Sequence, residues 1–395
     1  MFEKIVLRRS ETGPGLTLGD IAEALLFYEK VHVVLDVWSL KSLVDSLGTR
    51  ELLALLARKR ITAFYAEDML LTQNEVVGSL QYHWFDSGAI SGKPGDERPR
   101  SGRKGRLAMM LEINGHAPRE ARNLAERLLA HVRMNRLSSD YFVTGGIPKA
   151  AMADLADADY VRAAIRRVLQ DTIGFEAFAD DLRFEVILVS PKFLVRTNID
   201  FELGNARRKI LDPKLEAVSE SNLLGGLVDA RADTTLASYY GGDFHTSAVN
   251  SDIVRIRHAE LLKRSGISAT ERTQFKDIVL PDYPTIREVI NSGERSFDEF
   301  LKLLDKSDKF RESIHRMSPD ANLVHEYFNE VTKEGWISSV PAKTVRYVLV
   351  FAVGLSHPVV GAALSWADTF LLDKMGKGWR PNHFVDGKLK PFLDP

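Results

Sequence analysis

The chain up to residue 66 alternates between apolar residues at helical spacing and short, compact apolar runs. Helical spacing predicts amphipathic helices, whereas compact runs bounded by turn residues predict buried strands. The capping-box-like sequence T-L-G-D, which begins at Thr17, marks where the first helix should start. The expected elements are a helix over 17–28, a strand over 31–37, helices over 39–47 and 50–59 separated by Gly48 with Thr49 as N-cap, and a strand over 61–66. Two strands joined by a helical crossover predict a parallel pair, and therefore an α/β layer.

Between residues 68 and 203 two further strand-like patterns appear. The segments 75–85 and 106–113 are expected to be strands that flank a long hairpin tip, 91–105. This tip is rich in Gly, Pro and Arg, and such a composition cannot bury a core. The segments 184–189 and 192–201 predict a second hairpin around Ser190-Pro191. Amphipathic helices are expected over 118–137 and 160–170.

The strand-like pattern is lost from about residue 203 onward. Ser296 with Glu299 forms a capping box that predicts a helix start. The expected helices lie near 215–240, 252–264, 286–291, 297–317 and 320–334. We therefore predict a mixed α/β domain over 1–202, with a flexible basic hairpin tip at 91–105, followed by an all-α domain over 203–395.

The longest uncharged stretch, 347–367, contains no Asp, Glu, Lys or Arg. A straight helix of this length, at ~1.5 Å per residue, would be roughly 31 Å long, close to the thickness of a bilayer core. However, His357-Pro358 falls in its middle, and a proline disfavours an unbroken helix at that point. We expect two short helices buried in the helical domain, followed by a C-terminal strap. The alternative is an element that inserts into a membrane.

Composition excludes several kinds of chemistry. The 395 residues include no cysteine, so disulfides, thiolate nucleophiles and cysteine-ligated metal sites are ruled out. The formal net charge of −1 gives no overall indication of nucleic-acid or anionic-membrane binding. The ten histidines form none of the local zinc-binding patterns, and no nucleophile elbow of the form GxSxG occurs. The first ten residues carry only a short apolar run and do not resemble a signal peptide, so a cytoplasmic, bacterial protein is expected.

Two glycine-rich segments approach nucleotide-binding motifs without matching them. The segment 88–93 has three residues between its glycines where a phosphate-binding loop has four, and Pro94 stands where Ser or Thr is required. The segment 13–19 has one residue too many for a dinucleotide-binding loop, and no strand is expected close before it. We do not predict a nucleotide site at either segment.

Three acidic residues follow the two strands expected in the first part of the chain. Asp36 lies at the end of the first strand, and Glu67 and Asp68 follow the second. Because the carboxyl ends of parallel strands meet at one edge of a sheet, these carboxylates are expected to converge there. Such a cluster could hold Mg²⁺ or Mn²⁺ and activate water for phosphodiester hydrolysis, a layout found in PIN-like metal nucleases by analogy of fold. The alternative is that the three are ordinary acids at loop starts.

Two polar segments are candidates for contact with partners. The tip contributes basic residues that can contact nucleic-acid phosphates, namely Arg98, Arg100, Arg103 and Lys104. The C-terminal segment contributes side chains that make good protein anchors, namely Trp379, Arg380 and His383, although a strap that packs on the helical domain explains them as well. The short sequence GGDFH at 241–245 is expected to end a helix, with Asp243 and His245 in a turn or a polar site.

The sequence supports three functional hypotheses. The first is a cytoplasmic, non-catalytic accessory protein that acts through a protein partner and needs no cofactor. The second is a metal-dependent phosphodiesterase that uses the strand-end acids with Mg²⁺ or Mn²⁺. The third is a membrane-acting effector that uses 347–367.

Overall fold

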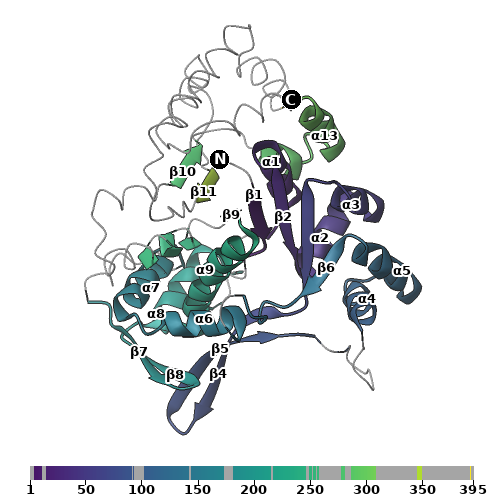
Figure 1. The fold of residues 1–395 in the computed structure, drawn as a ribbon. Helices are drawn as coiled ribbons and strands as arrows, with labels where there is room; N and C mark the ends of the chain where they lie inside the picture. The colour runs from purple at the N-terminus through teal and green to yellow at the C-terminus, as the bar shows by residue number, and fades with distance from the viewer. Residues whose placement is uncertain are drawn as a thin grey trace, which may run out of the picture.

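A computed structural model of the chain shows the arrangement of two sheets and the helices around them (Figure 1). It describes residues 4–10, 15–90, 92, 102–141, 144–172, 181–214, 217–245, 249–250, 252–254, 256–257, 277–280, 286–307, 345–348 and 392. Mixed α/β content is confirmed.

The larger sheet has seven strands in the order β10-β11-β9-β1-β2-β3-β6. Five of them are parallel neighbours, and β11 and β10 extend the β9 side as antiparallel strands. The strands are β1 (Lys4–Arg8), β2 (Lys30–Leu35), β3 (Ile61–Ala66), β6 (Val132–Asn135), β9 (Asp243–His245), β10 (Asp277–Leu280) and β11 (Val345–Val348).

Both faces of the central strands β1, β2 and β3 are buried, because successive residues of these strands enter different cores. In β1, for example, Ile5 and Leu7 pack into one hydrophobic cluster and Val6 packs into the other. The first cluster is covered by helices α1 (Leu18–Phe27), α2 (Val37–Leu47), α3 (Thr49–Leu56), α4 (Arg103–Ile113), α5 (Pro118–Leu129), α12 (Ile286–Asn291) and α13 (Phe297–Asp305). The second is formed mainly with helices α6 (Gly146–Asp154), α7 (Ala158–Thr172) and α9 (Glu220–Tyr240). Helix α8 (Phe201–Leu211) lies on the same side of the large sheet as α9 (Figure 1).

The smaller sheet is antiparallel, with the order β4-β5-β8-β7. Its strands are β4 (Met69–Val77), β5 (Leu80–Gly88), β7 (Phe184–Val189) and β8 (Lys192–Thr197). The β4–β5 hairpin turns at Gly78-Ser79, where Gly78 has φ +65°, a backbone conformation that favours glycine. This sheet extends from the body of the molecule below α6 and α7 (Figure 1).

The helices and strands predicted for residues 17–66 are confirmed, but the prediction of Thr49 as an N-cap is wrong. Thr17 caps α1, and its side chain and that of Asp20 form the expected reciprocal hydrogen bonds. The strands β2 and β3 are parallel neighbours, as the helical crossover predicted. Gly48 ends α2 with φ +78°, and this glycine rather than Thr49 is the N-cap of α3. The hairpin around Ser190-Pro191 is also confirmed.

The expectation of a hairpin around the basic tip is wrong. The segment 106–113 is not a strand but most of helix α4, and its five consecutive residues Leu107–Leu111 all pack into the first cluster. The predicted strand 75–85 contains the turn at Gly78-Ser79, so β4 pairs with β5 and not with a strand beyond the tip. The predicted helix 118–137 ends at Leu129, and Val132 begins strand β6, which pairs with β3.

The second half of the chain is not all-helical within the described residues. Gly241 ends helix α9, as expected for the GGDFH segment, but Asp243 and His245 belong to strand β9, which pairs in parallel with β1, and not to a turn. Residues Val345–Val348 form β11, although residues 347 and 348 were expected to begin a helix. The second cluster joins Val6 and Val34 to residues of α9, and so it includes both sides of residue 203. A domain boundary at that residue stays a prediction.

Helix α1 makes a close contact with α12 near the N-terminal end of α1. The backbone N–H of Gly19 donates a hydrogen bond of 3.0 Å to Asn291 Oδ1, and Asn291 Nδ2 donates one of 3.0 Å to Thr17 Oγ1. An ion pair joins Asp20 to Arg287. A Cβ atom on Gly19 would lie 2.5 Å from the Arg287 backbone, so only glycine allows this approach without a shift.

Candidate functional site

The three strand-end acids lie at the carboxyl edge of the large sheet, where parallel-sheet proteins form their sites. Asp36 is the N-cap of α2, and its carboxylate accepts hydrogen bonds of 2.7 Å from both the backbone N–H and the hydroxyl of Ser39. Its second oxygen forms a 2.6 Å ion pair with Arg9 Nε. Asp36 therefore holds the start of a helix and an arginine from the neighbouring strand end.

Glu67 and Asp68 are also occupied by neighbours. Glu67 pairs with Arg106 of α4 at 2.6 Å and with Arg136, which follows β6, at 3.5 Å. Asp68 accepts hydrogen bonds from the backbone N–H groups of Leu137 and Ser138, at 2.6 and 3.1 Å. These contacts tie α4 and the segment after β6 to the end of β3.

Tyr65, the residue before the end of β3, feels the charge of these acids. Burial raises the pKa of the Tyr65 phenol, and the negative charges of Asp36 and Glu67 raise it further, so this phenol stays neutral at physiological pH. Within the described residues, no group of three or more histidine and acidic side chains is arranged to hold a metal ion. The three acids follow the carboxyl ends of neighbouring parallel strands, as expected, and their carboxylates contact arginines, hydroxyls and backbone N–H groups.

A buried ion network next to this edge was not anticipated from the sequence. Arg8, at the end of β1, forms ion pairs with Asp229 and, at 2.7 Å, with Asp233, both on α9. Ser10 Oγ donates a hydrogen bond to Asp229, and Asn250 Nδ2 donates another of 3.2 Å. These five side chains are all buried, and a buried charge is stable only when it is paired. The network fixes α9 to the central strand of the sheet.

A cavity of about 240 Å³ lies between this network and β4. Its walls combine hydroxyl, amide and carboxylate groups with aliphatic side chains, contributed chiefly by Leu70, Thr72, Ser221, Asn222, Val228 and Asp229. The carboxylate in the wall is that of Asp229, which already binds Arg8, Ser10 and Asn250. We therefore interpret the cavity as a space beside the buried ion network and not as a ligand site.

The sequence did not predict a strand shortly before the glycine-rich segment 13–19. Strand β1 nevertheless ends at Arg8, and helix α1 begins at Leu18. The first N–H groups of α1 nevertheless have protein acceptors. That of Gly19 donates to Asn291, and that of Asp20 donates to Thr17 Oγ1. Because these two N–H groups already bind protein acceptors, we still do not predict a dinucleotide site here.

The basic residues of the predicted tip are only partly within the described chain. Arg103 and Lys104 form the first turn of α4, and Lys104 pairs with Glu126 of α5. Arg98 and Arg100 lie outside the described residues, as do Trp379, Arg380 and His383. Contact of these residues with nucleic acid or protein stays a prediction.

Most of the apolar stretch 347–367 also lies outside the described residues, apart from the end of β11. In the described part of the chain, no helix is both long enough and apolar enough to cross a bilayer.

The small sheet has one face that packs on helices and one that does not. Cross-strand partners share a face, and alternate residues of a strand point to opposite faces. His83, Phe85 and Phe193 lie on the inner face, where they are buried, and both phenylalanines join the second cluster with residues of α6, α7 and α9. The opposite side of the sheet is called the outer face below.

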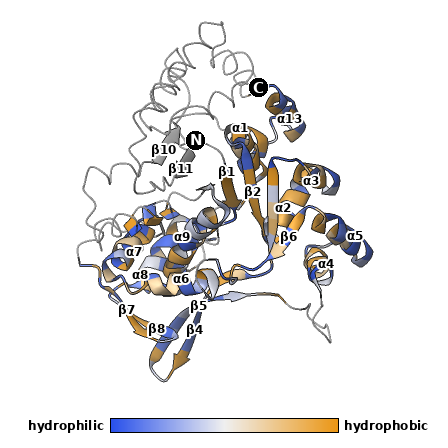
Figure 2. Ribbon diagram, in the orientation of Figure 1, coloured by the Kyte–Doolittle hydropathy of each residue, from blue (hydrophilic) through white to orange (hydrophobic). Residues whose placement is uncertain are grey.

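The outer face carries apolar side chains on all four strands. The register places Val77 beside Leu80, Tyr82 beside Leu194 and Leu194 beside Ile187. The apolar residues of this face are Met69, Leu71, Val77, Leu80, Tyr82, Trp84, Ile187, Val189 and Leu194. Met69, at the start of β4, packs against the first hydrophobic cluster. The others belong to neither cluster, and Val77, Leu80 and Val189 are 54%, 48% and 43% exposed. Figure 2 shows these hairpins as partly orange, apolar segments at the far end of the sheet.

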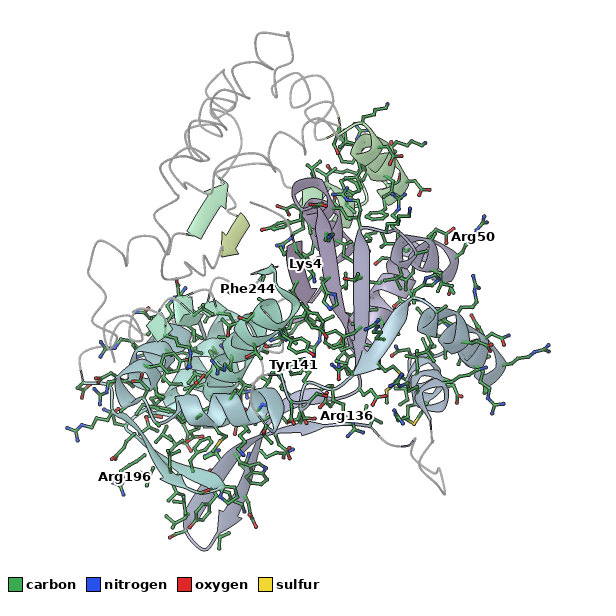
Figure 3. The ribbon with its side chains drawn as sticks, viewed as in Figure 1. Lys4, Arg50, Arg136, Tyr141, Arg196 and Phe244 are labelled. Atoms are coloured by element: carbon green, nitrogen blue, oxygen red, sulfur yellow. The ribbon has the colours of Figure 1, made fainter. Side chains whose placement is uncertain are left out.

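Four of the charged side chains on the outer face form two pairs of opposite sign. Lys192 forms an ion pair with Glu75 and lies 4.9 Å above the ring of Trp84. Arg196 lies 3.4 Å from Glu185 and points away from the helices (Figure 3). The face is therefore apolar, with paired charges of both signs among and around its apolar side chains.

Comparison of the chain with protein-family models, with characterised proteins and with solved structures gave no match.

Proposed function

We propose that this protein is a non-catalytic binding protein that acts through a protein partner held on the outer face of the small sheet. One observation carries the proposal: all four strands present apolar side chains on this face, and none of these side chains except Met69, at the start of β4, joins a core. A sheet normally buries its apolar face against a second layer. Contiguous apolar patches left exposed mark interaction sites.

The residue types on this face support the proposal. Trp84 and Tyr82 lie on β5, one of the two inner strands of the small sheet, and large aromatic side chains near the centre of an interface contribute most to binding energy. The charged side chains lie among and around them in pairs of opposite sign. The carboxyl edge offers weaker support for catalysis, since Asp36, Glu67 and Asp68 are each engaged by protein groups.

The test is affinity purification from the native cells with three matched baits. The wild-type protein is compared with Leu194→Glu, which places a charge at the centre of the outer face, and with Ile210→Glu on α8. Ile210 is 82% exposed and lies off the small sheet, so it controls for the added charge. We expect a stoichiometric partner with wild type and Ile210→Glu that is lost with Leu194→Glu. Equal capture by all three baits would refute a role for the outer face.

A further inference from the structure

We infer that the element bound at the outer face is a short amphipathic α-helix of another protein. This inference rests on the proposed function and gives the partner a stated chemistry. Three features of the described residues favour a helix over a second copy of this chain and over nucleic acid: the size of the face, its charges, and the way the same sheet is covered on its other side.

The face is too small for a stable pair of identical subunits. Four strands spaced ~4.8 Å apart give a width of roughly 20 Å, and the rows from Leu80 to Leu71 extend over about six residues, or roughly 20 Å. The resulting footprint is about 400 Å², whereas a standard stable interface buries about 800 Å² on each partner. A helix of about 14 residues is roughly 21 Å long, which matches the span of the face.

The charges of the face fit a mixed amphipathic helix better than a polyanion. Lys192 and Arg196 would have to leave Glu75 and Glu185 to contact phosphates, and the acids would then face the phosphates unpaired. Asp86 adds a further exposed carboxylate beside Leu71. Although Tyr82 and Trp84 could stack on bases, stacking platforms for single strands lie in positively charged grooves. A helix with both signs of charge along its polar border meets no such repulsion.

The inner face of the same sheet shows how its apolar side chains are buried. There, Phe85 and Phe193 pack with residues of α6, α7 and α9. The outer face alternates with these residues along the same strands and lacks an equivalent layer among the described residues. A helix added from a partner would complete a helix–sheet–helix arrangement, the usual way to bury both faces of a sheet.

The test is selection from a library of random 16-residue peptides displayed on phage, with the purified full chain as target. Peptides retained by wild type are screened against Leu194→Glu and Ile210→Glu, and their apolar positions are aligned. We expect enriched peptides with apolar residues at i, i+3 or i+4, and i+7, which lose at least about tenfold in affinity on Leu194→Glu and none on Ile210→Glu. Their binding should also shift the fluorescence of the wild-type protein, and Trp84→Phe should remove most of that shift.

Each other outcome overturns the helix inference. Enriched peptides with apolar residues at every second position would show that the free edges of β4 or β7 add a strand. A Leu194-dependent dimer of the chain at micromolar concentration, measured by light scattering, would show that the occupant is a second copy. Selection of no peptide that depends on Leu194 would also reject the helix. If affinity purification still yields a Leu194-dependent partner, the proposed function stands and only the helix fails; if it does not, both fail.

Discussion

His32 shows how the position of one side chain makes stability depend on pH. It lies on β2, nearly fully buried, stacked on Tyr240 with ring centroids 3.9 Å apart, and its Nδ1 lies 2.7 Å from Thr62 Oγ1. Its Nε2 has no hydrogen-bond partner within the described residues. Burial, reinforced by the positive charge of Lys4, lowers the pKa of His32 to about 3. The imidazole therefore stays neutral in the folded protein at every pH at which the protein is handled.

We predict that this histidine destabilises the protein in mild acid. In the unfolded chain its pKa is about 6.5, so below that pH the unfolded state binds a proton that the folded state excludes. The free energy of unfolding should fall by up to about 1.4 kcal/mol per pH unit as the pH drops from about 6.5 toward 3. In His32→Gln, urea denaturation at pH 7, 6 and 5 should show a correspondingly shallower fall. Parallel curves for the two proteins would contradict the prediction.

A second prediction at the residue scale concerns Asp229. Because Asp229→Ala leaves the buried Arg8 with fewer acceptors, we expect it to lower the free energy of unfolding by about 3–5 kcal/mol. The matched control is Asp159→Ala, since Asp159 is an exposed acid 3.7 Å from Arg162 in α7. The control should change stability by less than about 0.5 kcal/mol. Chemical denaturation measures both variants, and similar values for the two would show that the network contributes little.

At the scale of elements, Gly19 determines how closely α12 approaches α1. Gly19→Ala would usually favour a helix by about 1 kcal/mol. Here the new Cβ would meet the Arg287 backbone, so we expect α12 to separate from α1 and its amides to exchange hydrogen faster. Gly15→Ala is the control, because a Cβ there would have no atom within 4 Å. Unchanged exchange of α12 amides in Gly19→Ala, measured by mass spectrometry, would rule out this close contact.

Elements defined by neighbouring residues could be predicted from the sequence, and those defined by distant pairing could not. The capping residues Thr17 with Asp20 and Ser296 with Glu299 are three positions apart, so their pattern is visible locally. Strand β9 is only three residues long and is stabilised as a strand by β1, more than 230 positions earlier, so no local periodicity indicates it. Helix α4 was wrongly predicted as a strand because all of its residues from Leu107 to Glu112 are buried, which removes the helical alternation of apolar and polar positions.

The candidate sites also divide into features that the sequence could predict and features that depend on contacts between distant residues. The acids at the ends of β2 and β3 could be placed at one edge because the rule for parallel strands depends only on strand order. Their partners Arg9, Arg106 and Arg136 come from three other parts of the chain, so the sequence did not show that these carboxylates are occupied. The outer face was missed for a similar reason, since the turn at Gly78-Ser79 lies inside what resembled a single strand.

At the scale of the whole molecule, a net charge of −1 gives little electrostatic repulsion between copies. The exposed apolar hairpin should therefore limit solubility near neutral pH. We predict that Val77→Lys with Leu80→Lys keeps the protein dispersed at higher concentration, with little change in melting temperature. The control is Leu203→Lys with Ile210→Lys, which adds the same charge at exposed apolar positions of α8. Static light scattering over a concentration series compares the two double variants. An equal gain in solubility for both would show that the added charge alone, and not the loss of the apolar hairpin surface, causes the effect.

The place of β1 between β2 and β9 has a consequence for synthesis on the ribosome. The strand is translated first, and β2 follows within about thirty residues, but β9 emerges only after residue 245. During that interval the growing chain has one side of its first strand without its final neighbour, and Arg8 without Asp229 and Asp233. At 5–20 residues per second, roughly ten seconds or more separate the two events. The nascent chain is therefore exposed to misassembly along this open edge, and chaperones that bind during translation would act on it there.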